Sequence, residues 1–300
     1  MNASLISFIA RGFSWLPLRW NRATGTLLAR VMWALNTRAR QITQVNLRLC
    51  FPDLTEQQRN SLARESLRQT GQLLTECTWI WHRPNRFALD HIRDIVGETL
   101  LNDALDSPRG LIVVSPHMGN WEVCSLAVSS RTELTYFYRS PRQTALEPLL
   151  LKWRAHIGGR PATLDAGGIR HGLKLLKQGG TLGILPDQEP DRENGVFAPF
   201  FNVPALTMTL LPRLAARSNA QVIFTVAERL EAEQGWRLHF LAANPAIYSR
   251  DPVESAQALN SDVERCIDIC QAQYLWDYKR FSSLENGERR SYSCPRGERH

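Results

Sequence analysis

The stretch GLIVVSPH, residues 110–117, is a run of branched apolar residues that ends in a serine, a proline and a histidine. Consecutive apolar residues without polar alternation are typical of a strand that is buried on both faces of a parallel sheet. In such sheets, ligands collect at the carboxyl ends of the strands. The pattern therefore places His117 at the edge of the sheet where a functional site is expected.

Beyond this strand, short β-rich runs alternate with helical patterns. Strands are predicted at 110–115, 134–140, 161–164, 180–186, 221–230 and 236–243, and helices near 142–157, 169–178, 206–218 and 253–274. Earlier in the chain, Thr55 and Gln58 have the spacing of a capping box at the start of a long amphipathic helix. The alternation predicts an α/β fold, with a mixed, mostly parallel sheet covered by helices on both faces.

The net charge of +7 is located at the N-terminus. No acidic residue precedes Asp53, and the basic residues before it equal the whole excess of the chain; they are Arg11, Arg19, Arg22, Arg30, Arg38, Arg40 and Arg48. Apolar pieces with three tryptophans lie between them. Arginine mixed with tryptophan and leucine, without acids, is typical of a segment in a lipid interface. Residues 1–45 are therefore predicted to be a basic, amphipathic helical segment that associates with an anionic membrane surface.

Other interpretations of the N-terminus stay open. None of its apolar pieces reaches the roughly 18 uncharged residues that a spanning helix requires. The composition also fits a solvated pair of basic helices packed on the main domain, or a transit peptide. A nucleic-acid partner is not expected, since no groove-reading motif accompanies the arginines. The main domain is expected at 46–283, followed by a polar, aperiodic and disordered tail at 284–300.

The residues after His117 suggest a catalytic pair. Gly119 and Asn120 permit a tight turn with Asn120 as a plausible N-cap, which puts Glu122 in the first turn of a helix. Glu122 would then orient the imidazole of His117, while the other ring nitrogen removes a proton from a nucleophile. The alternative is a strand-end histidine bonded to backbone beside a surface glutamate. The spacing alone does not choose between the two.

A second stretch, GTLGILPDQEPDRENGVFAPFF at 180–201, ends a strand at Pro186 and places Asp187 at the same edge as His117. The apolar residues 196–201 that follow suit a ligand that is polar at one end and hydrocarbon at the other. The alternative is a plain turn whose apolar loop folds into the core.

Neither a metal nor a cofactor site is expected from the sequence. The other histidines show no metal-ligand spacing, and neither a GxSxG nucleophile elbow nor a GxxxxGK[ST] phosphate loop occurs. The six cysteines are irregularly spaced, which indicates reduced thiols. If the protein is an enzyme, the energy for group transfer must arrive in its substrate.

Four motifs in order resemble the lipid A biosynthesis acyltransferases, the lauroyl and myristoyl transferase family. They are NLRLCFPDLT at 46–55, the HxxxxE of HMGNWE at 117–122, LPDQ with GVFAPFF at 185–201, and QYLWDYKRF at 273–281. The resemblance implies a fold similar to that of the glycerol-phosphate acyltransferases, and catalysis by His117 and Glu122. It also implies that Arg154 and Asp187 belong to the site as substrate-binding residues, and Asn120, inside the HxxxxE motif, is grouped with them.

The resemblance further implies an acyltransferase at the cytoplasmic face of the bacterial inner membrane. Its donor would be an acyl carrier protein thioester. Its acceptor would be a hydroxyl of a lipid A precursor, in the secondary acylation of lipopolysaccharide biosynthesis. Two alternatives are an acyltransferase for another glycolipid or glycerolipid, and a non-catalytic lipid-binding protein at a membrane surface. The sequence departs from the family at the N-terminus, where arginines interrupt the usual apolar anchor.

Overall fold

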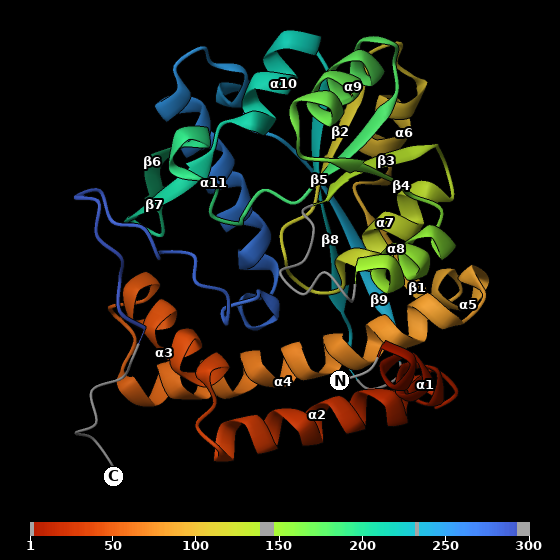
Figure 1. The fold of residues 1–300 in the computed structure, drawn as a ribbon, viewed down its shortest axis with the longest axis vertical. Coiled ribbons are helices and arrows are strands. Elements are labelled where there is room, and N and C mark those ends of the chain that lie inside the picture. The colour runs from red at the N-terminus through yellow and green to blue at the C-terminus, as the bar shows by residue number, and fades with distance from the viewer. Residues whose placement is uncertain (1–2, 139–146, 232–233, 293–300) are drawn as a thin grey trace.

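A computed structural model of the chain describes residues 3–138, 147–231 and 234–292. At its centre is a seven-stranded sheet with the order β1-β9-β8-β2-β5-β3-β4 (Figure 1). Neighbouring strands are parallel except for β8 and β9, which are antiparallel. The strands are β1 (Ile92–Val96), β2 (Leu111–Val114), β3 (Leu134–Tyr138), β4 (Arg160–Thr163), β5 (Thr181–Ile184), β8 (Gln221–Arg229) and β9 (Trp236–Ala242). The predicted mixed, mostly parallel sheet is confirmed, and β1 is a strand that the sequence pattern did not predict.

Strand β2 is buried on both faces, as its composition predicts. Leu111 and Val113 belong to one apolar cluster and Ile112 and Val114 to another, because successive side chains of a strand point to opposite faces. Helices α5, α6 and α7 supply the first cluster, and α9, α10 and α11 supply the second (Figure 1). Their bounds are α5 (Asn85–Leu89), α6 (Glu98–Asp106), α7 (Trp121–Ser129), α9 (Ala166–Lys177), α10 (Leu210–Ser218) and α11 (Pro252–Ile269).

The described chain begins with four helices that precede α5: α1 (Ala3–Ser14), α2 (Leu18–Ala34), α3 (Arg38–Cys50) and α4 (Glu56–His82). The predicted capping box starts α4, where the backbone N–H of Gln58 donates to the hydroxyl of Thr55 at 3.2 Å. The long α4 runs past one end of the sheet, and α2 lies along it (Figure 1). The N-terminal segment is therefore packed on the rest of the fold through α4.

Helix α2 buries polar residues among the side chains that it packs on the protein, and it exposes several apolar ones. Towards α4 it buries Asn21, Arg22 and Gly25, and a Cβ on Gly25 would come within 2.4 Å of the carbonyl oxygen of Gly71. Its outer side carries exposed apolar side chains, namely Trp20, Leu27, Leu28, Val31 and Leu35. This is the reverse of the usual surface helix of a globular protein.

The length of α2 does not suffice for a membrane span. Across residues 3–138, 147–231 and 234–292, no helix is both long enough and apolar enough to cross a bilayer. The expectation of an interfacial rather than a spanning segment is compatible with this finding, but membrane association itself is a separate question.

The apolar segment 196–201 forms part of a β-hairpin. Strands β6 (Gly195–Phe200) and β7 (Val203–Met208) pair antiparallel, and the two turn residues Phe201 and Asn202 have positive φ. Phe200 is 1% exposed and belongs to the main apolar cluster. The structure therefore supports the alternative in which this segment folds into the core. Because 203–208 pair with β6, the helix predicted near 206–218 begins only at Leu210.

Two further predictions differ from the structure in their bounds. Of the helix predicted near 142–157, residues 142–146 lie outside the described residues, and α8 (Glu147–His156) covers the rest. Part of the predicted disordered tail, 284–292, packs back on the fold. There the hydroxyl of Tyr292, a residue 6% exposed, accepts a hydrogen bond from the backbone N–H of Phe281 at 3.0 Å. A buried aromatic ring thus fixes a segment whose composition is otherwise polar.

Candidate active site

The loop between β2 and α7 carries His117 past the carboxyl end of the sheet. Gly119 in this loop has a φ of +57°, and a Cβ there would lie 2.0 Å from the carbonyl oxygen of Ala227. Only glycine adopts this conformation so close to another backbone without strain. The predicted tight turn is therefore present, and α7 begins directly after Asn120.

His117 is paired with Asp187. Its Nδ1 lies 2.7 Å from Oδ1 of Asp187, and its backbone N–H donates to Oδ2 at 2.9 Å. Asp187 follows β5, the direct neighbour of β2 in the sheet. Burial alone would raise the pKa of Asp187, but the imidazole and hydrogen bonds of His117 outweigh it and lower this pKa. An ionised Asp187 accepts a hydrogen bond from Nδ1–H, which leaves Nε2 as the basic nitrogen of the ring.

Two further side chains from the sequence motifs contact the imidazole of His117. The amide nitrogen of Gln188 lies 3.3 Å from Nε2, and the ring of Trp121 packs edge-on with its centroid 4.9 Å from that of the imidazole. Trp121 belongs to the HMGNWE motif and Gln188 to the LPDQ motif, although the sequence gave neither of them a role. The long contact to Gln188 is one that a substrate hydroxyl can replace.

Glu122 is paired with Arg154 and not with His117. Nε and Nη2 of Arg154 donate to the same oxygen of Glu122 at 3.0 and 2.8 Å. The Glu122 side chain is 3% exposed and that of Arg154 is 31% exposed, and the carboxylate raises the pKa of the guanidinium. The expectation that Glu122 orients His117 is thus corrected, because Asp187 occupies that position.

The expected grouping of Asp187 and Asn120 as substrate-binding residues also needs correction. Asp187 is 4% exposed and lies behind the imidazole, and Asn120 is fully buried. Neither lines the cavity next to His117. The amide nitrogen of Asn120 donates to Oε2 of Glu76 at 2.9 Å and does not cap α7. The buried carboxylate of Glu76 needs hydrogen-bond donors, which explains why the side chain of Asn120 points inward.

Glu76 is the centre of a buried charged cluster, called here the Glu76 cluster, formed with Arg22, Arg229 and Asn120. Nε of Arg22 lies 2.6 Å from Oε1 of Glu76, and Nε and Nη2 of Arg229 lie 2.8 Å from its two oxygens. Burial alone would raise the pKa of Glu76, but Arg229 and Arg22 lower it to about 2. Arg229 also donates to the carbonyl oxygen of Gly119 at 3.2 Å. The cluster therefore joins α2, α4 and β8 to the loop that carries His117.

The motif at 273–281 holds the same loop from another side. The backbone N–H of Leu275 donates to the carbonyl oxygen of His117 at 2.9 Å. In return, the backbone N–H of Gly119 donates to the carbonyl oxygen of Gln273 at 3.0 Å. These main-chain bonds fix the loop without using any group that reacts.

The remaining motifs attach to this segment as well. Nδ2 of Asn46 donates to the carbonyl oxygens of Trp276 and Tyr278, at 2.8 and 2.7 Å. The backbone N–H of Glu189 donates to the hydroxyl oxygen of Tyr278 at 2.9 Å. The four motifs singled out in the sequence are therefore joined to one another through the 273–281 segment.

A cavity of about 1010 Å³ opens beside His117. Glu122, Arg154 and Gln188 line it together with the histidine. Elsewhere its wall includes apolar side chains from several elements, among them Val113, Val128, Leu134, Ile157, Leu173, Leu210 and Leu214. A polar end with an apolar interior suits an amphiphilic ligand that carries a hydrocarbon chain.

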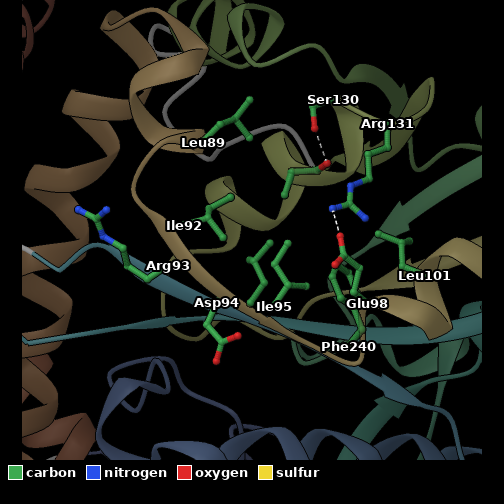
Figure 2. Close-up of a pocket in the computed structure, with 12 residues that line it drawn as sticks. Leu89, Ile92, Arg93, Asp94, Ile95, Glu98, Leu101, Ser130, Arg131 and Phe240 are labelled. Carbon is green, nitrogen blue, oxygen red and sulfur yellow. Dashed lines mark hydrogen bonds and ion pairs between the residues drawn. The ribbon is translucent and has the colours of Figure 1, made fainter.

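A smaller cavity of about 440 Å³ lies near β1 (Figure 2). Strand β1 is at one edge of the sheet, and β3 and β4 are at the opposite edge. Leu89, Ile92 and Ile95 line it, and the ion pair of Glu98 with Arg131 lies at its border. None of the residues predicted for the site lines this cavity. Charged and polar residues line it as well, and two of them, Glu98 and Arg131, are paired with each other, so we assign it no role.

Within the described part of the chain, no three His, Cys, Asp or Glu side chains form a group that could hold a metal ion. The five cysteines in this part, Cys50, Cys77, Cys124, Cys266 and Cys270, are free thiols.

An α/β sheet with a carboxylate-supported histidine at the mouth of a cavity with an apolar interior is the arrangement of an enzyme suited to general-base chemistry on a lipid-like ligand. Comparison with known families agrees with this class. The family model described as bacterial lipid A biosynthesis acyltransferase matches residues 2–283, and the chain belongs to this family. The match includes the N-terminal helices as well as the sheet.

Characterised relatives are similar over most of the chain. The lipid A biosynthesis lauroyltransferase of Escherichia coli strain K12 is 26% identical, over 94% of this chain and 93% of its own length. The palmitoleoyltransferase of the same strain is 26% identical over 89% and 87% of the two chains, and the myristoyltransferase is 22% identical over 94% and 87%. The relatives thus differ in the acyl group that their names state.

Proposed function

We propose that this protein is an O-acyltransferase that moves a fatty acyl chain from an acyl carrier protein thioester to a hydroxyl of a lipid A precursor. Its position would be the cytoplasmic face of the bacterial inner membrane. The observation that carries the proposal is the His117–Asp187 pair at the polar end of a cavity with an apolar interior. Family membership supports the reaction class, and the names of the relatives support the acceptor.

In the proposed reaction, Nε2 of His117 removes the proton of the acceptor hydroxyl as its oxygen attacks the thioester carbonyl carbon. The tetrahedral intermediate then collapses, the carbon–sulfur bond breaks, and the thiolate takes the proton from the imidazolium. The ester bond replaces the thioester bond, so no outside energy source is required. Asp187 holds the ring in the tautomer that leaves Nε2 free and stabilises the imidazolium that forms.

Arg154 is proposed to bind an anionic part of a substrate or the oxygen that gains negative charge. Glu122 holds the guanidinium by two hydrogen bonds, and 31% of the Arg154 side chain stays exposed. A cation in a cavity that excludes part of the water attracts an anion more strongly than one in bulk water, because the surroundings screen its charge less. In this assignment Glu122 is a positioning residue for Arg154, and His117 is the residue that handles the proton.

The outer side of α2 supports the proposed membrane attachment. Trp20, Leu27 and Val31 are exposed on it, and Arg19 and Arg30 are exposed beside them. A helix that buries polar residues against the protein and exposes apolar ones is suited to a lipid interface, with arginines beside anionic headgroups. Arg22 takes no part in such contacts because it is 4% exposed and belongs to the Glu76 cluster.

The function is tested by incubating the purified protein with an acyl carrier protein thioester and a tetra-acylated lipid A precursor. We expect the mass of the lipid to rise by one acyl group, and His117→Ala to abolish this rise. An acceptor with its acyl-chain hydroxyls removed serves as the control and should stay unmodified. Transfer to a glycerolipid with no transfer to the lipid A precursor would show that the acceptor has been assigned wrongly.

A further inference from the structure

Helices α9 and α10 carry a group of exposed positive charges, called here the basic edge. All members are exposed, and neither helix contains an aspartate or glutamate. In the described parts of the chain, no acidic side chain lies within ion-pair distance of any of them. The members are Arg170, Lys174 and Lys177 of α9 and Arg213 and Arg217 of α10.

The basic edge borders the same cavity as His117. Arg213 and Arg217 are among its lining residues, as are Ile169 and Leu173 of α9. At about 100° per residue, the three basic residues of α9 lie about 60–120° round the helix from the side that Ile169 and Leu173 occupy. The charges therefore lie beside the cavity opening, whereas the apolar side chains of the same helices form its wall.

The position of the basic edge indicates what kind of partner it meets. Helices α9 and α10 lie at one end of the long axis of the molecule, and α2 lies at the other (Figure 1). If the exposed apolar side of α2 rests on a membrane, the lipid headgroups lie at the end of the molecule opposite to α9 and α10. A soluble partner can approach α9 and α10 from the solvent.

We infer that the basic edge docks an acidic, soluble carrier protein that delivers the acyl thioester into the cavity. This inference rests on the proposed function, since it assigns a docking surface to the donor of that reaction. Five exposed positive charges, with one carboxylate, that of Asp165, close to Arg170, attract an acidic surface over several ångströms and favour one orientation of the carrier. The carrier itself stays outside, and only its thioester arm enters between the two helices.

The test uses the charge-reversal variant Lys174→Glu/Lys177→Glu, because neither lysine lines the cavity and both are exposed. Two donors are compared with the same acceptor: acyl carrier protein thioester and acyl-pantetheine, which has the thioester without the protein. With the carrier donor we expect kcat/KM to fall by about tenfold or more, mainly through KM. With acyl-pantetheine the rate should stay within about twofold of wild type. Arg86→Glu on α5, another exposed basic residue, is the matched control.

Direct binding is measured in parallel by titrating unacylated acyl carrier protein into wild type and variant at low and high salt. Tighter binding to wild type that weakens with salt supports the inference. Equal binding to both, or an equal loss of rate with both donors, overturns it. A raised KM for the lipid acceptor with acyl-pantetheine as donor also overturns it, because the basic edge would then bind the acceptor. Failure of the wild type to transfer acyl groups while it still binds the carrier would instead count against the proposed function.

Discussion

Nδ1 of His117 and Oδ1 of Asp187 lie 2.7 Å apart, although 70 residues separate them in the chain. The contact exists because β2 and β5 are adjacent parallel strands, so the residues that follow each strand meet at one edge. Asp187, and not Glu122, which is nearer in the sequence, is therefore the carboxylate that orients the imidazole.

Replacing Asp187 by asparagine is expected to lower kcat by at least about tenfold without unfolding the protein. The amide presents a different set of donors and acceptors to Nδ1 and cannot stabilise the imidazolium as a carboxylate does. His117→Ala should cost about 10² to 10⁴ in kcat, the range for loss of a general base. Rates are measured with saturating donor and acceptor. Glu193→Gln, which changes an exposed carboxylate in the same loop, serves as the control. Equal kcat values for Asp187→Asn and Glu193→Gln would refute the role of Asp187 as the partner of His117.

Glu122 and Arg154 are expected to act as one unit that is distinct from His117. Glu122→Ala, Arg154→Ala and the double variant form a double-mutant cycle with kcat/KM as the readout. The double variant should lose little more than the worse single variant, because each substitution already breaks the pair. Arg154→Ala should act mainly through KM, since the contact is made before and during the reaction. Fully additive losses would mean that the two side chains work separately.

The Glu76 cluster is expected to make stability depend on acid. The folded-state pKa of Glu76, about 2, lies below its ordinary value of 4.5. The stabilisation is therefore complete above about pH 4.5 and is lost as the pH falls towards 2. Glu76→Gln should be less stable by about 3–5 kcal/mol at pH 7, since two arginines lose a buried partner. Urea unfolding of both proteins at pH 7, 4 and 3 should show this gap narrowing, and a gap independent of pH would contradict the prediction.

Asp277 is expected to weaken the fold at neutral pH. Burial raises its pKa to about 6 from an ordinary 3.8, and in the described structure its Oδ1 has no hydrogen-bond partner. For an acid with a raised folded-state pKa, the penalty is absent below pH 3.8 and complete above pH 6. Asp277→Asn should therefore raise the unfolding free energy at pH 7 by about 2 kcal/mol and change it little at pH 3.5. Thermal unfolding at the two pH values measures this, and a destabilised variant at pH 7 would refute it.

Attachment to anionic vesicles is expected to need the apolar outer side of α2. Leu27→Asp/Val31→Asp should weaken co-sedimentation with the vesicles by about tenfold or more, because two exposed apolar side chains no longer enter the interface. Arg30→Gln should weaken it less, and its remaining binding should be less sensitive to salt. Circular dichroism checks that both variants are folded. Unchanged binding of the double variant would place the lipid contact elsewhere on the molecule.

Much of the fold was predictable because β2, β3 and β5 have the apolar runs that buried strands require. The order of the strands was not, since no local pattern states which strand lies beside which. For the same reason the sequence suggested Glu122 as the partner of His117, being five residues away, and could not show that Asp187 arrives from the adjacent strand. The position of His117 at the strand end, by contrast, followed from the strand alone.

The role of Arg22 could not be predicted either. In the sequence it is one of seven similar arginines in a segment without acids, and composition assigned all seven to a membrane surface. Its burial depends on Gly25 and Gly71, which let α2 approach α4 closely enough for the side chain to reach Glu76. Such a close helix contact is a property of the packed structure, and single-sequence periodicity does not reveal it.

The Glu76 cluster also orders events during synthesis of the chain. Glu76 lies 54 residues after Arg22 and 153 residues before Arg229. On the ribosome, α2 and α4 can pack against each other while most of the sheet has yet to be translated. The loop of His117 makes its contacts only after β8 and Gln273 have been synthesised. Arg229 of β8 then donates to the carbonyl oxygen of Gly119, and the N–H of Gly119 donates to the carbonyl oxygen of Gln273. A nascent chain would therefore have α2 packed on α4 before the loop of His117 reaches the contacts that fix it.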